Sequence, residues 1–401
     1  GIDPQILHDI VSRNAQGILG MVDMFSGGAL GRMTIFALNI MPYISASIIV
    51  QLMTAVSPHL EALKKEGEAG RKKLNQYTRY GTVGLAAVQA LGIAMGLEGA
   101  GGGGGPSPVL DPGIFFRFTT VITLTGGTVF LMWLGEQITA RGVGNGISLI
   151  IFSGIVARMP TALAALLELG RTGARSPVLI VLFLILAVAV ITFIVFMERA
   201  QRRILVQYPK RQVGNKMFGG EASHLPLKLN TSGVIPPIFA SSLLLLPATF
   251  AGFSANQTGF LADIGTYMRH GSPAYIALYV GLIIFFCFFY TAIVFNPTET
   301  ADNLRKYGGF IPGIRPGKNT ADYLDYVLTR LTVPGAIYLA GVCVLPEILV
   351  SQYNVPFYFG GTSLLIVVSV TMDTVAQIHS HLLAHQYEGL IKKAKLRGRR
   401  G

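Results

Sequence analysis

The strongest constraint on this chain is a series of apolar runs, each about as long as a helix that crosses a lipid bilayer. Such a helix needs roughly 20 apolar residues. Runs near that length lie at 34–55, 80–97, 114–136, 146–167, 177–197, 231–251, 273–295, 328–350 and 358–384. Only 13% of the residues are charged, against about 25% in an ordinary soluble domain. We therefore expect an all-α polytopic membrane protein with nine full spans.

Basic residues collect in alternate loops between these runs. Of the 32 Lys and Arg residues, 25 fall in the segments 56–79, 137–145, 198–230, 296–330 and 385–401. The positive-inside rule places these segments in the cytoplasm. Topology alone therefore accounts for the net charge of +12, and a functional basic surface is the alternative interpretation.

Two short matches indicate an internal repeat. Aligning Pro42 with Pro236 matches "MPYISAS" in the first run to "IPPIFAS" in the sixth, and "GISLII" in the fourth run aligns with "GTSLLI" in the ninth. Both pairs are displaced by five spans, which is typical of two halves of five spans each. Because five is odd, the second half is inverted, and inverted repeats place the working site at their interface near the bilayer midplane.

The repeat also predicts how the chain is divided. The N-terminal half lacks its first span in this scheme, because the chain begins at Gly1 just ahead of the second. The expected parts are an external segment at 1–33, an N-terminal half at 34–170, and a C-terminal half at 171–401 with large cytoplasmic loops at 198–230 and 296–327 and a basic tail at 385–401.

Within the external segment, residues 17–33 form an apolar piece that is broken by glycines. It is too short to span, and a full span follows at once. We expect it to be re-entrant or interfacial, lying where protein or water surrounds its backbone. A plain external loop is the alternative.

The sequence contains none of the usual signatures of nucleotide, zinc or thiol chemistry, namely GxxxxGK[ST], HExxH and CxxC. We expect no enzyme and no cofactor. His381 and His385 lie one helical turn apart, but their segment offers no acidic or cysteine partner, so we predict no metal site. Ionisable residues are sparse within the spans, and Asp373 is the main deep candidate for an ion path.

Isoleucines stand at the positions that the repeat pairs. Two runs each carry isoleucines four residues apart, on one face of a helix, and two partners follow from the repeat. The residues are Ile40, Ile44, Ile147, Ile151, Ile238 and Ile366. Together they would form an apolar ring around a shared axis, and such a constriction can gate by dewetting. Packing against lipid or a neighbouring helix is the ordinary alternative.

Five stretches resemble the bacterial SecY family, the channel subunit of the Sec translocon. They are "MFSGGALGRMTIFALNIMPYISASIIVQLM", "KKEGEAGRKKLNQYTRYGT", "FLMWLGEQITARGVGNGISLIIF", "TETADNLRKYGGFIPGIRPG" and "VPFYFGGTSLLIVVS". The resemblance covers essentially the whole chain. It departs in starting after the family's first span and in the glycine-rich external loop from Gly99 to Pro108.

The resemblance implies a set of site residues. The pore ring falls on the six isoleucines. The plug falls on Gly17, Ile18, Leu19, Gly20, Met21, Val22, Asp23, Met24, Phe25, Ser26, Gly27, Gly28, Ala29 and Leu30. The lateral gate, between the spans at 34–55 and 231–251, falls on Ser45, Ile48, Ile49, Gln51, Thr78, Ser241 and Ser242. The residues that the resemblance assigns to binding of the ribosome or the motor are Arg202, Arg203, Lys210, Arg211 and Arg315.

A channel function follows from the resemblance. It implies a protein-conducting channel of the bacterial cytoplasmic (inner) membrane that passes unfolded secretory polypeptides and releases apolar helices sideways into lipid. The implied partners are SecE, SecG, the SecA motor ATPase, the ribosome with its RNA and proteins at the exit tunnel, nascent chains with signal sequences, and membrane lipid. Two alternatives are a secondary transporter for a small solute, which inverted repeats also suit, and a structural membrane scaffold.

Overall fold

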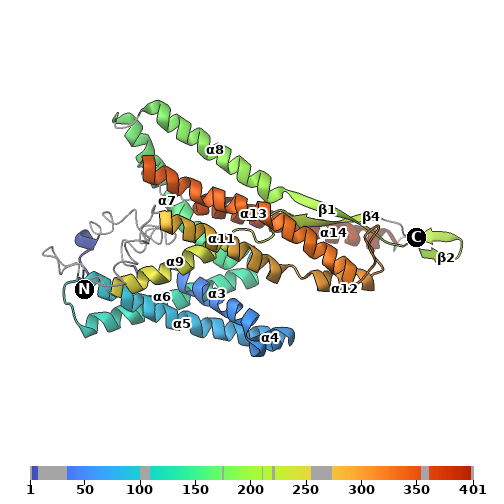
Figure 1. The fold of residues 1–401 in the computed structure, drawn as a ribbon, viewed down its shortest axis with the longest axis horizontal. Coiled ribbons are helices and arrows are strands. Elements are labelled where there is room, and N and C mark those ends of the chain that lie inside the picture. Colours follow the sequence, from blue (N-terminus) through green and yellow to red (C-terminus); the bar gives the residue numbers. More distant parts are fainter. Residues whose placement is uncertain are drawn as a thin grey trace.

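The computed structural model describes residues 2–7, 34–99, 109–173, 176–209, 211–218, 222–253, 273–353 and 361–398. These residues form a bundle of long helices with strands at one end (Figure 1). The helices are α3 (Met41–Val56), α4 (Pro58–Lys65), α5 (Glu68–Gly99), α6 (Ile114–Arg141), α7 (Gly146–Arg171), α8 (Pro177–Arg199), α9 (Ile235–Phe253), α11 (Pro273–Val294), α12 (Pro297–Lys306), α13 (Lys318–Tyr353) and α14 (Gly361–Gly398). The strands are β1 (Gln201–Gln207), β2 (Arg211–Val213), β3 (Lys216–Phe218) and β4 (Ala222–Lys228).

Each predicted apolar run coincides with a helix, so the mainly helical membrane fold is confirmed. Among the described residues, six helices are long and apolar enough to cross a membrane, and a bent pair makes a possible seventh. The bent pair is α3 with α4, which meet at 99°. Each of the nine expected spans therefore lies on a helix. Helix α5 and the described part of α9, however, do not meet the criterion of length and hydropathy for a helix that crosses a membrane.

The first predicted span is only partly helical. Residues 35–40 form turns, and α3 begins at Met41, so Pro42 is its second residue. A proline in the first turn removes no hydrogen bond that the helix would otherwise make. Inside an unbroken helix over 34–55 Pro42 would disturb the hydrogen bonding, but here it lies in the first turn of a helix instead.

The paired segments of the repeat begin helices at matching residues. The second residue of α3 is Pro42 and that of α9 is Pro236, while α7 and α14 start at the matched glycines Gly146 and Gly361. Figure 1 shows α4, β1, β4 and the C-terminus toward one end of the molecule. The chain runs toward that end along α3 and leaves it along α9, so the two helices have opposite directions.

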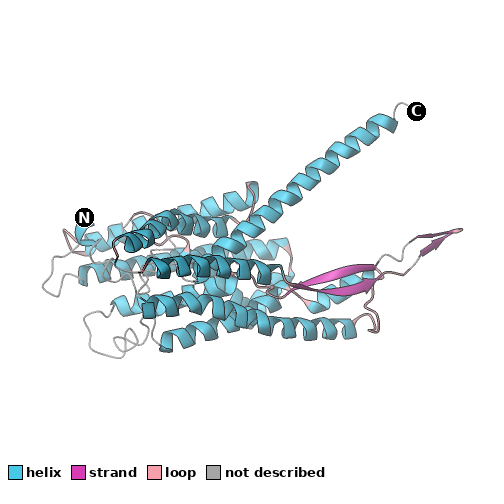
Figure 2. Ribbon diagram, turned by 90° about the horizontal axis from the view of Figure 1, so that it is seen from above, coloured by secondary structure: helices cyan, strands magenta, loops and turns pink. Residues whose placement is uncertain are grey.

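The strands were not predicted. Strand β1 pairs antiparallel with β4, from Gln201 opposite Lys228 to Gln207 opposite Ala222, and β2 pairs with β3. Figure 2 shows this hairpin reaching beyond the helices. Ile204 and Val206 point to the same side of β1, as alternate residues of a strand do, and both are buried.

The two large loops predicted to be cytoplasmic join into one small body. Gln207 and Phe310 exchange two backbone hydrogen bonds of 2.9 Å each. Around this bridge, Ile204, Val206 and Leu227 of the hairpin share an apolar core with residues of the second loop and of α13, including Ile311 and Leu324. We call this unit the cytoplasmic body.

Helix α14 continues to Gly398 and so includes the start of the predicted basic tail. Its second half projects away from the bundle (Figure 2). His381 and His385 are exposed on this part. Asp373, the main candidate for an ion path, is exposed on the same helix rather than enclosed by its neighbours.

Candidate functional site

The six isoleucines singled out in the sequence meet in one apolar cluster. Five of them are buried members of it, with exposed fractions between 0% and 8%, and Ile147 is partly buried against it. They come from the residue before α3, from α3 itself and from α7, α9 and α14. The structure thus brings together residues more than 320 positions apart.

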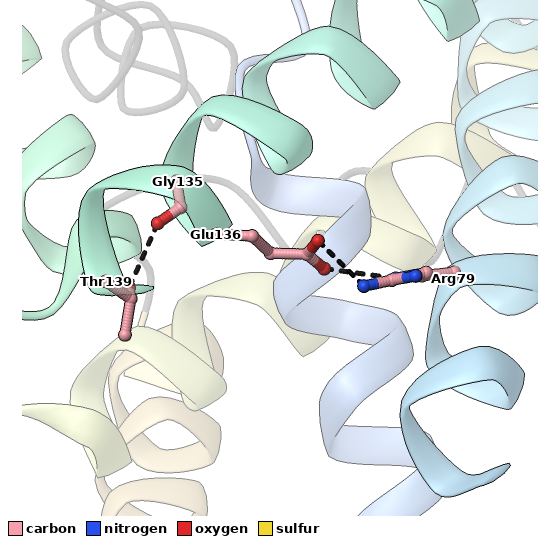
Figure 3. A network of polar contacts seen from close by, with 4 residues as sticks. All are labelled: Arg79, Gly135, Glu136 and Thr139. Atoms are coloured by element: carbon pink, nitrogen blue, oxygen red, sulfur yellow. Dashed lines mark hydrogen bonds and ion pairs between the residues drawn. The ribbon is translucent and has the colours of Figure 1, made fainter. Parts of the chain in front are cut away.

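Two glycines bring α7 close to α6. A Cβ atom added to Gly146 would overlap the carbonyl oxygen of Gly135. Between the helices, the Thr139 hydroxyl accepts from the Gly146 amide (2.9 Å) and donates to the Gly135 carbonyl (2.9 Å); Figure 3 shows the second of these bonds. This contact fixes the start of α7, one residue before Ile147.

Further contacts of the α7 start reach α14. The Gly144 amide donates to the side-chain oxygen of Gln377 at 2.7 Å. Gly144 has φ +85°, a conformation that suits glycine. Asn145 caps α7 by accepting from the Ile147 amide at 3.2 Å. Gln377 lies well inside α14, beyond Ile366, so this bond joins the start of α7 to the middle of α14, the two helices that carry Ile147, Ile151 and Ile366.

Helices α5 and α6 form a hairpin with an ion pair near each end. Arg79 donates to both carboxylate oxygens of Glu136, at 3.1 and 2.8 Å (Figure 3). At the other end, Arg117 and Glu98 pair at 2.7 Å. Sequence reasoning missed both pairs. The available signal was that an isolated charge near the end of a span requires a partner.

The gate predicted between α3 and α9 is closed by direct packing. The Ser242 hydroxyl donates to the sulfur of Met41 across it (3.8 Å), and Ser241 lies 3.5 Å from the Tyr279 hydroxyl. Ser45 and Ile48 are fully buried on α3, and Ile49 is partly buried. Among the described residues, the interface therefore combines apolar packing with a long hydrogen bond to sulfur.

Polar atoms of the gate region are poorly satisfied. Ser45 Oγ and Gln51 Oε1 are buried without a hydrogen-bond partner in the part of the chain that the structure describes. The Thr78 hydroxyl donates within its own helix, to the Leu74 carbonyl at 3.0 Å. Thr78 therefore donates no hydrogen bond to Gln51 Oε1, and the polar cluster expected of these two residues does not form through that atom. Burying unpaired polar atoms costs about 1–3 kcal/mol each, which weakens the closed arrangement.

The predicted docking residues lie on or near the cytoplasmic body. Arg202 and Arg203 are exposed on β1. Arg315 is exposed in the second loop, and its carbonyl accepts from Thr320 at 2.8 Å. Arg211 lies in β2, opposite Phe218. Lys210 and the whole predicted plug, residues 17–30, are outside the described residues.

Comparison with known proteins gives concordant results. The SecY family model matches residues 34–375. The protein translocase subunit SecY of Rickettsia conorii is 60% identical over 397 residues, which cover 99% of this chain and 92% of that protein. A solved protein-conducting channel is similar with a TM-score of 0.66 at 17% identity, covering 89% of this chain and 84% of the other. Sec61 in the canine ribosome–channel complex gives 0.61 at 16% identity, with coverages of 89% and 84%.

Proposed function

Since the chain belongs to the SecY family and forms a protein-conducting channel, we propose that its six clustered isoleucines are the seal and that α3 and α9 are its lateral gate. The chain is a multi-pass subunit of the protein translocase in the bacterial cytoplasmic membrane and is not an enzyme. The observation that carries the proposal is the meeting of isoleucines from four separate membrane segments in one buried cluster.

Chemically, the seal works by excluding water. A narrow apolar constriction is dewetted, so hydrated ions do not cross it although no charge repels them. Aliphatic side chains change rotamer on a fast timescale and make no directional bonds, so an extended polypeptide can displace them without breaking hydrogen bonds. Residues 17–30 act in this proposal as a plug that supports the seal.

The gate sorts polypeptide segments by polarity. A signal helix is apolar, and its transfer to lipid is favourable by about 0.8 kcal/mol per CH₂ group. Such a helix can replace the apolar contacts between α3 and α9 with its own and has to break a long bond to sulfur. Polar segments gain nothing from lipid and continue through the pore.

Exposed arginines on the cytoplasmic body suit partners that carry negative charge. Arg202, Arg203 and Arg315 present cations to RNA phosphates or acidic protein surfaces, with salt-dependent affinity. Because the similar canine channel is described in a ribosome–channel complex, we assign this surface, with Lys210 and Arg211, to the ribosome or the SecA motor. SecE and SecG complete the proposed assembly.

Crosslinking of a translocating chain tests the pore assignment. A photoreactive amino acid is placed at Ile44 or Ile238 and an exported polypeptide is stalled in the channel. Both positions should give strong adducts to the stalled chain. The matched control is Ile194, which is equally buried in the same cluster but lies on α8 outside the proposed ring. Equal adducts at Ile194, or none at the two ring positions, contradict the assignment.

A further inference from the structure

A group of polar side chains lies where α8, the connection from β4 to α9, and α13 meet. The Asn230 amide nitrogen donates to Glu198 Oε1 at 2.9 Å, and the Tyr338 hydroxyl donates to the same oxygen at 3.4 Å. Ser232 donates to Asn230 Oδ1 at 3.0 Å. Asn230, Ser232 and Tyr338 are all buried, with at most 6% of their surface exposed. We call these four residues the Asn230 network.

Asn230 also shapes the turn that leads into the gate helix. Its amide nitrogen makes a second bond, to the Gly233 carbonyl at 3.2 Å. Both side-chain atoms of Asn230 are therefore engaged, and the residue joins Glu198 of α8 to the chain two residues before α9. Gly233 has φ +66°, so the chain turns sharply there.

Helix α13 presses on the same turn. A Cβ atom added to Gly335 would overlap the carbonyl oxygen of Leu229 and lie 3.6 Å from the Cα atom of Asn230. The glycine thus allows backbone-to-backbone contact between α13 and the residues that precede α9. Gly335 is one helical turn from Tyr338, so one face of α13 contacts both the backbone that precedes α9 and the Glu198 carboxylate that holds Asn230.

The connection that leads into α9 and the face of α9 toward α3 are held with different strength. In the connection, Asn230 donates to the Glu198 carboxylate of α8, and such bonds are about twice as strong as neutral ones. Toward α3, the polar contact of α9 among the described residues is the weak bond from Ser242 to Met41. A force that parts the helices should therefore separate α9 from α3 first.

We propose that Asn230 is a positioning residue that fixes the start of α9 against α8 and α13 and thereby sets how readily the lateral gate opens. This inference rests on the proposed gate between α3 and α9. Loosening the Asn230 network gives α9 more freedom, so a weaker signal helix suffices to part it from α3.

The test compares export of two precursors, one with an intact signal helix and one with a charged residue inserted in that helix. The readout is the ratio of the second to the first. Asn230→Ala should raise this ratio on the order of tenfold, since it removes hydrogen bonds to a charged group. A purely structural role would lower export of both precursors and leave the ratio unchanged.

Three further variants sharpen the result. Gly335→Ala displaces the same turn by another mechanism and should also raise the ratio. Tyr338→Phe removes the longest bond of the network and should raise it by about twofold, which keeps the proposal testable if Asn230→Ala does not accumulate. Thr231→Ala is the matched control, because Thr231 lies in the same turn but bonds only to the Lys228 carbonyl in the described contacts.

Covalently linking α3 to α9 distinguishes a failure of this inference from a failure of the gate assignment on which it rests. Met41→Cys with Ser242→Cys allows a short bifunctional thiol crosslinker to join α3 to α9, and the linked fraction is measured by gel shift. If the linked channel no longer inserts apolar helices, but Tyr338→Phe and Gly335→Ala behave like Thr231→Ala without the link, the network inference is wrong and the gate stands. If the linked channel inserts apolar helices normally, the gate assignment fails and the inference fails with it.

Discussion

Asn39, the residue before the first isoleucine of the seal, has a backbone conformation that few side chains tolerate. Its φ is +51°, and among the described residues it is the one non-glycine residue with positive φ. Asparagine visits this region more readily than most residues, and β-branched residues rarely do. The conformation ends the turns at 35–40 and directs Ile40 into the cluster.

Substitutions at Asn39 should therefore follow backbone preference. Asn39→Gly should keep the resting ion conductance of reconstituted vesicles close to wild type, because glycine adopts positive φ without strain. Asn39→Val should raise this conductance several-fold, because rebuilding the turn moves Ile40 out of the seal and strain of about 1–2 kcal/mol favours that change. Equal conductance of the two variants would show that the conformation is not needed for sealing.

At residue scale, the spacing of isoleucines was the informative signal in the sequence. The i to i+4 spacing of Ile40 and Ile44 and the repeat partner Ile238 led to residues that the structure brings together. The partner of Arg79 was out of reach, because Glu136 lies 57 positions away and no local pattern pairs them. Long-range pairing depends on helix register, which hydropathy alone does not fix.

At the scale of elements, the contact between α6 and α7 depends on two small residues. Gly146→Ala should destabilise the channel by about 1–3 kcal/mol, as overpacking does, because the added Cβ meets the Gly135 backbone. Thermal unfolding of the protein in detergent measures the effect. Gly126→Ala on α6 is the matched control, since nothing lies within 4 Å of its added Cβ, and it should be neutral or slightly stabilising. A neutral Gly146→Ala would contradict the close packing.

Helices were predicted far better than strands. A run of about 20 apolar residues admits few structures in a membrane other than a helix. The strand β1 reads "QRRILVQ" and places only Ile204 and Val206 inward, which is too short a pattern to stand out in a basic loop. Its core is completed by residues such as Ile311 and Leu324, more than 100 positions away.

For the whole molecule, the inverted repeat provided the architecture. It predicted that segments five spans apart would play matching parts, and the paired helices do begin at matching prolines and glycines. The division at residue 171 and the roles of plug, ring and gate remain predictions.

The rival functions are decided at this scale as well. A solute transporter coupled to an ion needs an enclosed ionisable residue, and the main candidate, Asp373, is exposed. The near relative is a protein translocase subunit at 60% identity. Both findings favour the protein-conducting channel over the transporter and over a passive scaffold.

The resting ion leak of the channel tests the central claim most directly. Ile44, Ile151, Ile238 and Ile366 are replaced together by glycine, and conductance is measured in reconstituted vesicles without any translocating chain. The account predicts a rise of at least about tenfold, because water fills the constriction once its apolar side chains are gone. Glycine at the buried Ile194 of the same cluster should leave the leak near wild type. An unchanged leak in the fourfold variant would contradict the isoleucine seal.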